Sequence, residues 1–291
     1  MEILDGKATS AAIKADLKVK VNEMVNAGHK APHLVAILVG ENPASKAYVG
    51  NKIKFCQEVG YRSTLLTFNA DITEDQLHKE IHKLNNDPEV DGYIVQLPLP
   101  KHISEDKILE IVNPEKDVDG FHPVNVGKMV SGLPSYLPAT PYGITKIMEH
   151  YGISAEGKFV VILGRSHIVG RPMSILLSQS RPYGNGTVVV CHSRTKNLEE
   201  LTRKADILVA AIGIPQFVKA EMVKDGAVII DVGINRIDDT TRTRGWRLVG
   251  DVDFDAVSEK ASYITPVPGG VGPMTIAGLM LNCYHAAQKR V

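Results

Sequence analysis

The sequence predicts an α/β protein with two domains, each built around a mostly parallel sheet. Short apolar runs alternate with segments of helical periodicity along the 291 residues, which is typical of βα units. A polar stretch at 113–137, frequent in glycine, proline and asparagine, interrupts the alternation, and a second βα series follows it. A chain of this length is long enough for two such domains.

The composition excludes several classes of function. Lysine plus arginine and aspartate plus glutamate both number 33, so no net charge attracts nucleic acid or an anionic membrane. No apolar stretch approaches the ~20 residues of a membrane span, and no signal peptide is visible. The three cysteines are far apart and form no CxxC motif, which indicates reduced thiols and no zinc site. We therefore expect a cytoplasmic protein without a metal centre.

The first βα series occupies the N-terminal part of the chain. Its predicted elements are helix 8–27, strand 34–39, helix 45–59, strand 63–68, helix 71–85 and strand 90–96. Ser45 is expected to cap the second helix and Gly60 to end it, whereas a Thr73–Gln76 capping box opens the third. Ligands of open α/β sheets bind at the carboxyl edge, which Lys52 and Gln96 can both reach.

Lys52 lies where the helical pattern calls for an apolar residue, in one stripe with Tyr48 and Phe55. Such a lysine either extends its amine to the rim or is buried with its charge destabilised, and spacing alone leaves both open.

The segment Lys116–Asn125 also has two possible interpretations. Its two close carboxylates, Asp117 and Asp119, serve either a turn or a binding site.

The second series begins after a hinge at Pro138–Pro141 and a helix at 142–150. Its strands are predicted at 159–163, 187–191, 207–211 and 228–231. Between the first two, the loop Gly164–Pro172 opens a helix that runs through Gln179. A strand, a glycine-containing turn and a helix form a Rossmann-like unit whose helix N-terminus can hold a pyrophosphate. Ser166 stands at the second glycine of that motif, so an ordinary strand–helix turn is the alternative.

The end of the second strand in this series indicates the cofactor. An NAD site usually has an acidic residue there for the ribose 2′-hydroxyl, but this chain has His192-Ser193-Arg194-Thr195. Together with Arg165, these residues suit a 2′-phosphate and favour NADP over NAD. The alternative is that Arg165 and Arg194 are solvated surface charges. The arginines of the predicted hairpin loop Thr240–Trp246 are likewise interpreted as solvated, and not as nucleic-acid ligands.

The C-terminal part combines a glycine- and proline-rich loop, Ile264–Thr275, with a last helix at 276–288. Pro273 suits the first turn of that helix. Such a loop brings bare backbone close to a flat ligand, but its residues do not specify which ligand.

Six segments in chain order resemble the bifunctional methylenetetrahydrofolate dehydrogenase/methenyltetrahydrofolate cyclohydrolase family, also called the FolD family. They are Tyr48-x-x-x-Lys52, Gln96-Leu-Pro-Leu-Pro100, Lys116-Asp-Val-Asp-Gly120, Gly164-Arg-Ser-x-x-Val-Gly170-x-Pro172, Asp231-Val-Gly-Ile-Asn235 and Pro266-Val-Pro-Gly-Gly-Val-Gly-Pro-Met-Thr275. The resemblance implies a folate-binding catalytic domain at 1–139 and an NAD(P)-binding Rossmann domain at 140–272. It also implies that helix 273–291 returns to the first domain, and that the protein is a homodimer.

The resemblance further assigns roles to individual residues. Lys52 would be the key cyclohydrolase residue, assisted by Gln96, and both would act with Tyr48 and Asp119 as the catalytic set. Tyr48 would pack on the pterin or p-aminobenzoyl ring, and Asp119 would bind the pterin N–H groups. The other implied folate contacts are Leu97, Pro98, Leu99, Pro268 and Gly272. The implied dinucleotide contacts are Thr140, Gly164, Arg165, Ser166, Ser193, Arg194, Ile234 and Thr275.

The expected function is therefore NADP-dependent oxidation of 5,10-methylenetetrahydrofolate, followed by hydrolysis to 10-formyltetrahydrofolate at the same site. A short-chain dehydrogenase is excluded by order, because its Tyr-x-x-x-Lys pair follows the glycine loop instead of preceding it. A shikimate-dehydrogenase-like oxidoreductase shares the domain order but gives no reason for the Asp119 segment. A non-catalytic nucleotide-binding regulator gives no reason for Lys52, Gln96 and Asp119.

Overall fold

The computed structural model describes residues 1–289, which divide into two compact units. The six-stranded unit comprises Met1–Ser10 and Thr140–Thr275. The three-stranded unit comprises Ala11–Ala139 and the chain from Ile276 onward. Three helices therefore contribute residues to both units: α1 (Gly6–Asn26), α10 (Val271–Gln288) and, through Ala139 alone, α6 (Ala139–His150). Within residues 1–289, no helix is both long and apolar enough to cross a membrane.

The smaller sheet has the strand order β3-β2-β4, and both pairings are parallel. Its strands are β2 (His33–Val39), β3 (Arg62–Phe68) and β4 (Gly92–Val95). β2 is central and buried along its whole length, which explains its uninterrupted apolar sequence. The register places Ala36 beside Leu65 on one strand and Ile94 on the other.

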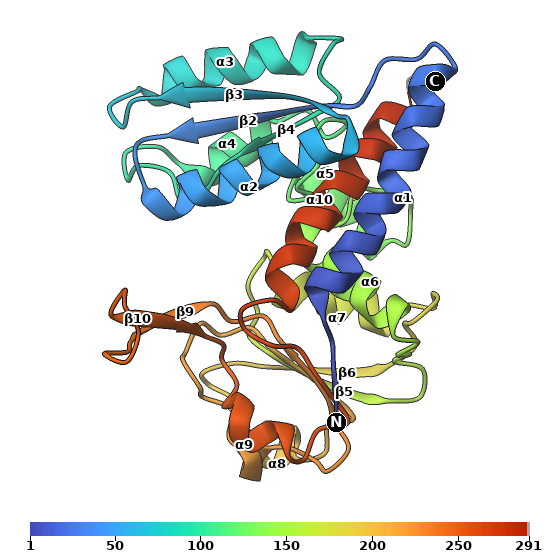
Figure 1. Cartoon of the computed structure of the whole chain (residues 1–291), viewed down its shortest axis with the longest axis vertical. Helices are drawn as coiled ribbons and strands as arrows, with labels where there is room; N and C mark the ends of the chain where they lie inside the picture. The colour runs from blue at the N-terminus through green and yellow to red at the C-terminus, as the bar shows by residue number, and fades with distance from the viewer. Residues whose placement is uncertain (290–291) are drawn as a thin grey trace. The chain divides into compact units, whose positions relative to one another are not determined.

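Helices cover both faces of this sheet, and α2 and α3 lie on opposite sides of it (Figure 1). The helices of the unit besides α1 and α10 are α2 (Pro43–Val59), α3 (Glu74–Asn86), α4 (Glu105–Ile111) and α5 (Pro123–Val130). Side chains of α3 and α4 form one core with Val35, Ile37 and Val39, which alternate along β2. The predicted capping box of α3 is present.

Several helix starts differ from the sequence prediction, and several short helices were not predicted. Asn42, and not Ser45, caps α2, because its side chain accepts hydrogen bonds from the Ala44 and Ser45 amides. The predicted end at Gly60 is confirmed by its left-handed conformation, with φ of 85°. α6 (Ala139–His150) begins three residues before the predicted Tyr142. The short helix α5 was not predicted, because its anchor is the buried polar side chain of Asn125 and not an apolar stripe.

The larger sheet has the strand order β1-β11-β8-β7-β5-β6, and all its pairings are parallel. Four of its strands were predicted from the sequence: β5 (Phe159–Leu163), β6 (Thr187–Cys191), β7 (Ile207–Ala210) and β8 (Val228–Asp231). The other two, β1 (Glu2–Ile3) and β11 (Tyr263–Ile264), have only two residues each. Such strands are too short for an alternating pattern to be visible.

The pairing of β1 with β11 changes the expected domain limits. It assigns Met1–Ser10 to the six-stranded unit, whereas the sequence placed the whole of 1–139 in the other domain. At the C-terminus, α10 joins the three-stranded unit from Ile276 onward, three residues later than the predicted start at 273.

The remaining elements of the six-stranded unit surround the sheet. They are α6, α7 (Gly170–Ser178), α8 (Leu198–Thr202), the 3₁₀ turn η1 (Ala220–Met222), α9 (Phe254–Ser258) and the antiparallel pair β9 (Asn235–Asp238) and β10 (Trp246–Val249). The predicted hairpin loop at 240–246 connects β9 to β10. The core gathers apolar side chains from β5, β7 and β8, including Val161, Leu208 and Ile229.

Substitution of two helical glycines by alanine should have opposite effects on the stability of the protein. Gly127 in α5 has open space where a Cβ would lie, so Gly127→Ala should stabilise the protein by roughly 0.5–1 kcal/mol through helix propensity. At Gly143 in α6, a Cβ would lie 2.3 Å from the Met274 carbonyl oxygen, so Gly143→Ala should destabilise by about 1–3 kcal/mol. Urea unfolding of both variants checks this, and two shifts of the same sign would contradict it.

Candidate active site

Lys52 is buried in the three-stranded unit, although its side chain is ionisable. Only 4% of it is exposed, and its Nζ donates a hydrogen bond to Gln96 Oε1 at 3.2 Å. The amine also lies over the Tyr48 ring, 4.7 Å from its centroid, where a cation is attracted by the aromatic face. Of the two possibilities that spacing left open, extension to the rim is therefore wrong and burial is correct.

Gln96 is oriented by the end of β4. Its backbone amide donates to the Ile37 carbonyl at 2.9 Å, which continues the sheet by one residue. Its side-chain Nε2 donates to the Leu97 carbonyl at 2.7 Å. Because the amide nitrogen is engaged there, the Oε1 atom is presented to Lys52. The pairing thus joins the middle of α2 to the carboxyl edge of the sheet.

The two carboxylates of the 116–125 segment have different surroundings. Asp117 is buried and accepts hydrogen bonds from the amides of Gly120, Phe121 and His122 and from the Asn125 side chain. Burial raises the pKa of Asp117 to about 6, against the opposing effect of these donors. Asp117 therefore holds the turn together, as one of the two interpretations of this segment proposed.

Asp119, two residues further on, has a carboxylate without such partners. Among the described residues none donates a hydrogen bond to it, and its principal electrostatic interaction is with Lys52. Burial raises the pKa of Asp119, while Lys52 opposes the shift. Burial correspondingly lowers the pKa of Lys52, and Asp119 opposes that change. The unit thus holds a buried amine and an acceptor-rich carboxylate in one electrostatic cluster.

The segment after Gln96 continues this cluster on the same edge. Leu97 and Leu99 are half-buried, whereas Pro98 is exposed. The Leu99 amide donates to Glu105 Oε1 at 3.1 Å, which ties the segment to the start of α4. The structure therefore brings together Tyr48, Lys52, Gln96, Leu97–Leu99 and Asp119 within one unit.

Asn282 on α10 is a buried polar residue that was not predicted from the sequence. It is 1% exposed, and its Nδ2 donates to the carbonyl oxygens of Val118 and Leu137, both at 2.8 Å. Val118 precedes Asp119 in the chain, and the Asp119 carbonyl accepts from the amide of Ala139, two residues after Leu137, at 3.1 Å. A buried polar side chain in an otherwise apolar helix was the one available signal.

The six-stranded unit contains the predicted glycine turn between β5 and α7. Gly164 has φ of 108°, and a Cβ on it would lie 2.2 Å from the Ala211 carbonyl oxygen. A Cβ on Gly170 would lie 2.2 Å from the Gly164 carbonyl oxygen. Between them, Ser166 is exposed and its Oγ accepts from the amides of Val169 and Gly170. The two glycines are therefore required for this turn, and Ser166 stabilises it.

The loop after β6 lies at the same edge of the sheet, because β5 and β6 are parallel neighbours. Ser193 and Arg194 are exposed, as is Arg165. Within residues 1–289, neither arginine forms an ion pair with a carboxylate. The loop is shaped by its flanking residues, since the His192 amide donates to Thr195 Oγ1 and the Arg194 amide to His192 Nδ1. The charged side chains are thus available to an anion.

Five further predicted residues lie in the six-stranded unit. The hydroxyls of Thr140 and Thr275 are hydrogen-bonded to each other at 3.0 Å. Ile234 is 60% exposed, which is unusual for so large an apolar side chain, and lies against Gly272. Pro268 and Gly272 were expected near the folate. They belong to this unit, so the structure does not bring them together with Lys52 inside a single unit.

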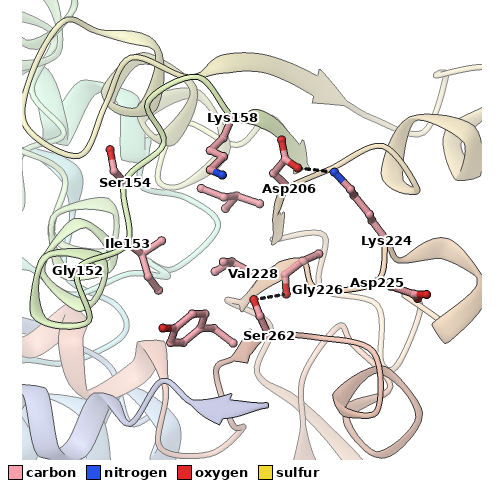
Figure 2. A pocket seen from close by; sticks show the side chains of 13 residues that line it. Gly152, Ile153, Ser154, Lys158, Asp206, Lys224, Asp225, Gly226, Val228 and Ser262 are labelled. Carbon is pink, nitrogen blue, oxygen red and sulfur yellow. Dashed lines mark hydrogen bonds and ion pairs between the residues drawn. The ribbon is translucent and has the colours of Figure 1, made fainter.

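A cavity of about 360 Å³ opens at the opposite edge of the larger sheet, where its strands begin (Figure 2). Three of its charged lining residues form ion pairs: Lys224 donates to Asp206 at 2.5 Å, and Asp225 pairs with Lys260 at 3.0 Å. Because ligands of parallel sheets bind at the carboxyl edge, this cavity is not part of the candidate site.

One unit has a glycine turn at the carboxyl edge of a parallel sheet, and the other holds a buried lysine. These features are typical of two-domain nucleotide-dependent oxidoreductases. Family models specify the class further. Residues 4–119 match the catalytic domain of tetrahydrofolate dehydrogenase/cyclohydrolase, and residues 138–291 match the NAD(P)-binding domain of the same family. The chain belongs to the tetrahydrofolate dehydrogenase/cyclohydrolase family, which confirms the predicted family and enzyme class.

Individual relatives agree with this assignment along the whole chain. The "Bifunctional protein FolD" of Cytophaga hutchinsonii is 58% identical over 287 residues, which are 99% of each chain. The crystal structure of the bifunctional FolD from Campylobacter jejuni is 49% identical, with a TM-score of 0.94 over 100% of both chains. A FolD structure from Trypanosoma brucei, in complex with NADP cofactor and inhibitor, is 36% identical, with a TM-score of 0.91, and covers 98% of this chain and 97% of that one.

The shikimate-dehydrogenase alternative is similar in fold alone. The enzyme from Thermus thermophilus shares 14% identity, with a TM-score of 0.53, over 89% of this chain and 99% of that one. Since a fold of this type hosts many chemistries, the family assignment and the residues of the site decide the function.

Asn282→Leu should raise the KM for the folate substrate more than it lowers kcat, because the Val118 and Leu137 carbonyls lose their donor and the Asp119 backbone shifts. The unsatisfied carbonyls should also lower stability by about 1–3 kcal/mol. Steady-state kinetics and urea unfolding measure both effects. Asn86→Leu is the matched control, because Asn86 is exposed and bonds only within its own helix. An unchanged KM in Asn282→Leu would show that Asn282 does not position the Asp119 loop.

Proposed function

We propose that the chain oxidises methylenetetrahydrofolate with NADP to methenyltetrahydrofolate and hydrolyses this product to 10-formyltetrahydrofolate, with Lys52 as the proton acceptor of the second reaction. The observation that carries the proposal is the buried Lys52 amine, hydrogen-bonded to Gln96 and lowered in pKa by burial. A lysine with an ordinary pKa is protonated near neutral pH and does not accept a proton. Burial favours the neutral form of Lys52, which can accept a proton.

Substrate binding is assigned to Asp119 and Tyr48. The Asp119 carboxylate receives no hydrogen bond from the described residues, so both its oxygens can accept from the amino and ring N–H groups of a pterin. Tyr48 is half-buried beside Lys52 and offers a ring for stacking. A cationic methenyl intermediate near these groups further disfavours a positive charge on Lys52.

The dehydrogenase reaction places few demands on acid–base groups. When bound, the dinucleotide accepts a hydride from the bridging methylene carbon, whose positive charge two adjacent nitrogens stabilise. No proton is transferred, so the contribution of the protein is to bind and orient both molecules. This explains why the six-stranded unit provides a rigid glycine turn and exposed polar groups and no buried base among the predicted cofactor residues.

The hydrolysis has different requirements. Water attacks the cationic carbon, a C–O bond forms, and one proton of the water must leave. The neutral Lys52 amine accepts that proton, and Gln96 keeps the amine in a fixed direction. Collapse of the resulting adduct breaks one C–N bond while the adduct's hydroxyl loses its proton to solvent, which leaves the formyl group on one nitrogen, and the other nitrogen takes up a proton. Lys52 is suited to deliver this proton as well.

The loops of the six-stranded unit fit a dinucleotide with a 2′-phosphate. A Cβ at Gly164 or Gly170 would fill the turn, so the bare backbone there can approach a pyrophosphate. Arg165 and Arg194 are exposed and unpaired within the described residues, and Ser193 lies between the strand end and Arg194. Arginine and hydroxyl groups bind a phosphate, whereas a 2′-hydroxyl calls for an acidic residue.

We also propose that the chain acts as a homodimer in the cytoplasm, as the family resemblance and composition predict. All three cysteines are buried free thiols, which supports a reducing compartment. Analytical ultracentrifugation tests the dimer, and a monomer at micromolar concentration would refute it.

The decisive assay supplies purified protein with methylenetetrahydrofolate and either NADP or NAD, and follows formation and decay of the methenyl product by its absorbance. Turnover with NADP and subsequent decay of the product are expected. No turnover with either cofactor would refute the proposed function.

Lys52→Met should lower the rate of methenyl hydrolysis by roughly 10²–10⁴-fold, which is the usual contribution of a positioned general base. Methionine preserves the volume of the side chain, so substrate binding should change much less. Direct hydrolysis of added methenyltetrahydrofolate measures the rate, and the KM reports binding. Lys54→Met is the matched control, because Lys54 is exposed on the opposite face of the same helix. Hydrolysis at the wild-type rate would refute the assignment of Lys52.

Arg165→Ala and Ser193→Ala should raise the KM for NADP more than the KM for NAD, because only NADP carries the 2′-phosphate. A charge-assisted hydrogen bond lost with arginine corresponds to roughly 1.5–3 kcal/mol, or about a ten- to hundredfold change. Initial rates with both cofactors measure the two constants. Equal changes for NADP and NAD would exclude a 2′-phosphate site at these residues.

A further inference from the structure

Two carboxylates of the six-stranded unit, Asp231 and Asp251, are buried next to each other and have no role in the proposed chemistry. They are 3% and 0% exposed, and the Asp251 amide donates to Asp231 Oδ1 at 2.9 Å. Asp231 ends β8, whereas Asp251 follows the end of β10 by two residues. Buried carboxylates are costly unless hydrogen bonds compensate them. The donors around these two side chains therefore indicate which parts of the chain they hold in place.

Asp251 holds the loop that follows β7. Its Oδ2 accepts from the amides of Ile212 and Gly213, at 2.7 and 2.9 Å. Because β7 ends at Ala210, this loop lies at the carboxyl edge of the sheet, where ligands of parallel sheets bind. The next residue, Ile214, is 48% exposed although it is large and apolar. Asp251 thus fixes the backbone that carries an exposed apolar side chain at this edge.

The loop after the neighbouring strand, β8, is attached to the same pair of carboxylates. Asp251 Oδ1 accepts from the Asn235 side chain at 2.9 Å. Asp231 Oδ1 accepts from the Gly233 amide, also at 2.9 Å. Between these two donors lies Ile234, the 60% exposed residue that is one of the expected dinucleotide contacts. Two exposed isoleucines on adjacent loops are therefore held through one pair of buried side chains.

The backbone packs so closely around the pair that little room is left for adjustment. A Cβ on Gly233 would lie 2.3 Å from Asp251 Oδ1, and one on Gly250 would lie 1.8 Å from Asp231 Oδ2. The same Asp231 Oδ2 accepts from the Val252 amide at 2.9 Å. Because backbone groups and not flexible side chains contact the carboxylates, the loss of either carboxylate should displace the loops themselves.

The strand order relates these loops to the expected cofactor site. In the sheet, β7 and β8 lie on one side of β5, and β6 lies on the other. The expected pyrophosphate site follows β5, and the residues expected at the 2′-phosphate, Ser193 and Arg194, follow β6. The adenosine half of a dinucleotide bound in this way lies at the end of β6, so its nicotinamide half extends toward β7 and β8. The exposed isoleucines offer that half an apolar surface.

We propose that Asp251 is a positioning residue for the nicotinamide half of the cofactor, because it fixes the two loops from which Ile214 and Ile234 contact that half. Since Asp251 is fully buried, it acts through these loops and not by touching the cofactor. The inference deepens the proposed function and rests on it, because it needs the dinucleotide at this edge of the sheet.

The experiment measures the Kd of two probes by titration calorimetry in the wild type, Asp251→Leu and Asp251→Asn. The probes are NADP and adenosine 2′,5′-bisphosphate, which lacks the nicotinamide half. Leucine keeps the branching of aspartate but accepts no hydrogen bond, so Asp251→Leu should raise the Kd for NADP about five- to thirtyfold. The Kd for the bisphosphate should not change. Asp251→Asn should restore most of the affinity, because its carbonyl oxygen still accepts from the two amides of the β7 loop.

Two further variants complete the test. Asp206→Leu controls for a general loss of stability, because Asp206 accepts from the Phe159 amide at 2.8 Å where β5 begins, at the opposite edge of the sheet. It should leave the Kd for NADP unchanged. Asn235→Leu removes only one of the links to Asp251 and should raise the Kd for NADP about two- to fivefold. It replaces Asp251→Leu in the comparison if that variant does not fold.

Three results would overturn the inference. They are an unchanged Kd for NADP in the folded variant, an equal rise of the Kd for the bisphosphate, and an equal rise in Asp206→Leu. The last two would show that the substitution loosens the whole unit and does not act on the nicotinamide half. Circular dichroism and urea unfolding establish which variants are folded. Failure of the proposed function is distinguishable, because the titrations need no turnover.

Discussion

The hydrogen bond from Lys52 to Gln96 is the interaction on which the arrangement of the three-stranded unit depends. An ammonium removed from water is costly unless hydrogen bonds and opposite charge compensate it. Here Gln96 provides the acceptor, Tyr48 an aromatic face and Asp119 the charge. These opposing influences set the pKa of Lys52: burial lowers it, and Asp119 limits the decrease. The role that we propose for Lys52 needs the neutral amine before proton transfer and the protonated amine after it, and such a balance keeps both forms accessible.

Asp119 takes part in this balance only because another aspartate holds the loop. Asp117 accepts the three amide hydrogen bonds of the turn, which leaves the next carboxylate along the chain without protein donors among the described residues. Asn282 then holds the Val118 and Leu137 carbonyls from α10. The two carboxylates therefore differ in role because of the donors around them and not because of their residue type. Neighbouring carboxylates in other sites diverge in function for the same reason.

Structural features that depend on residues close together in the sequence could be predicted, whereas features that depend on residues far apart could not. Local periodicity and glycine placement predicted β2, the body of α2 and the turn at Gly164, because neighbouring residues determine those features. The position of Lys52 as an anomaly was also visible, but its burial was not. Asn282 acts on residues more than a hundred positions away, and strands of two residues such as β1 exist only through their partner. Such long-range contacts leave no pattern in a local window of sequence.

The two reactions place different physical demands on the chain, and the two units meet them separately. Hydride transfer needs orientation, which the six-stranded unit provides through a turn where Gly164 and Gly170 leave no room for a side chain. Hydrolysis needs a proton acceptor, the role that we propose for Lys52, which the three-stranded unit buries. A substitution that disturbs the turn therefore affects cofactor binding, whereas one that exposes Lys52 restores its ordinary pKa. Because these demands are met in different units, the two activities can be altered independently by changes that leave the fold intact.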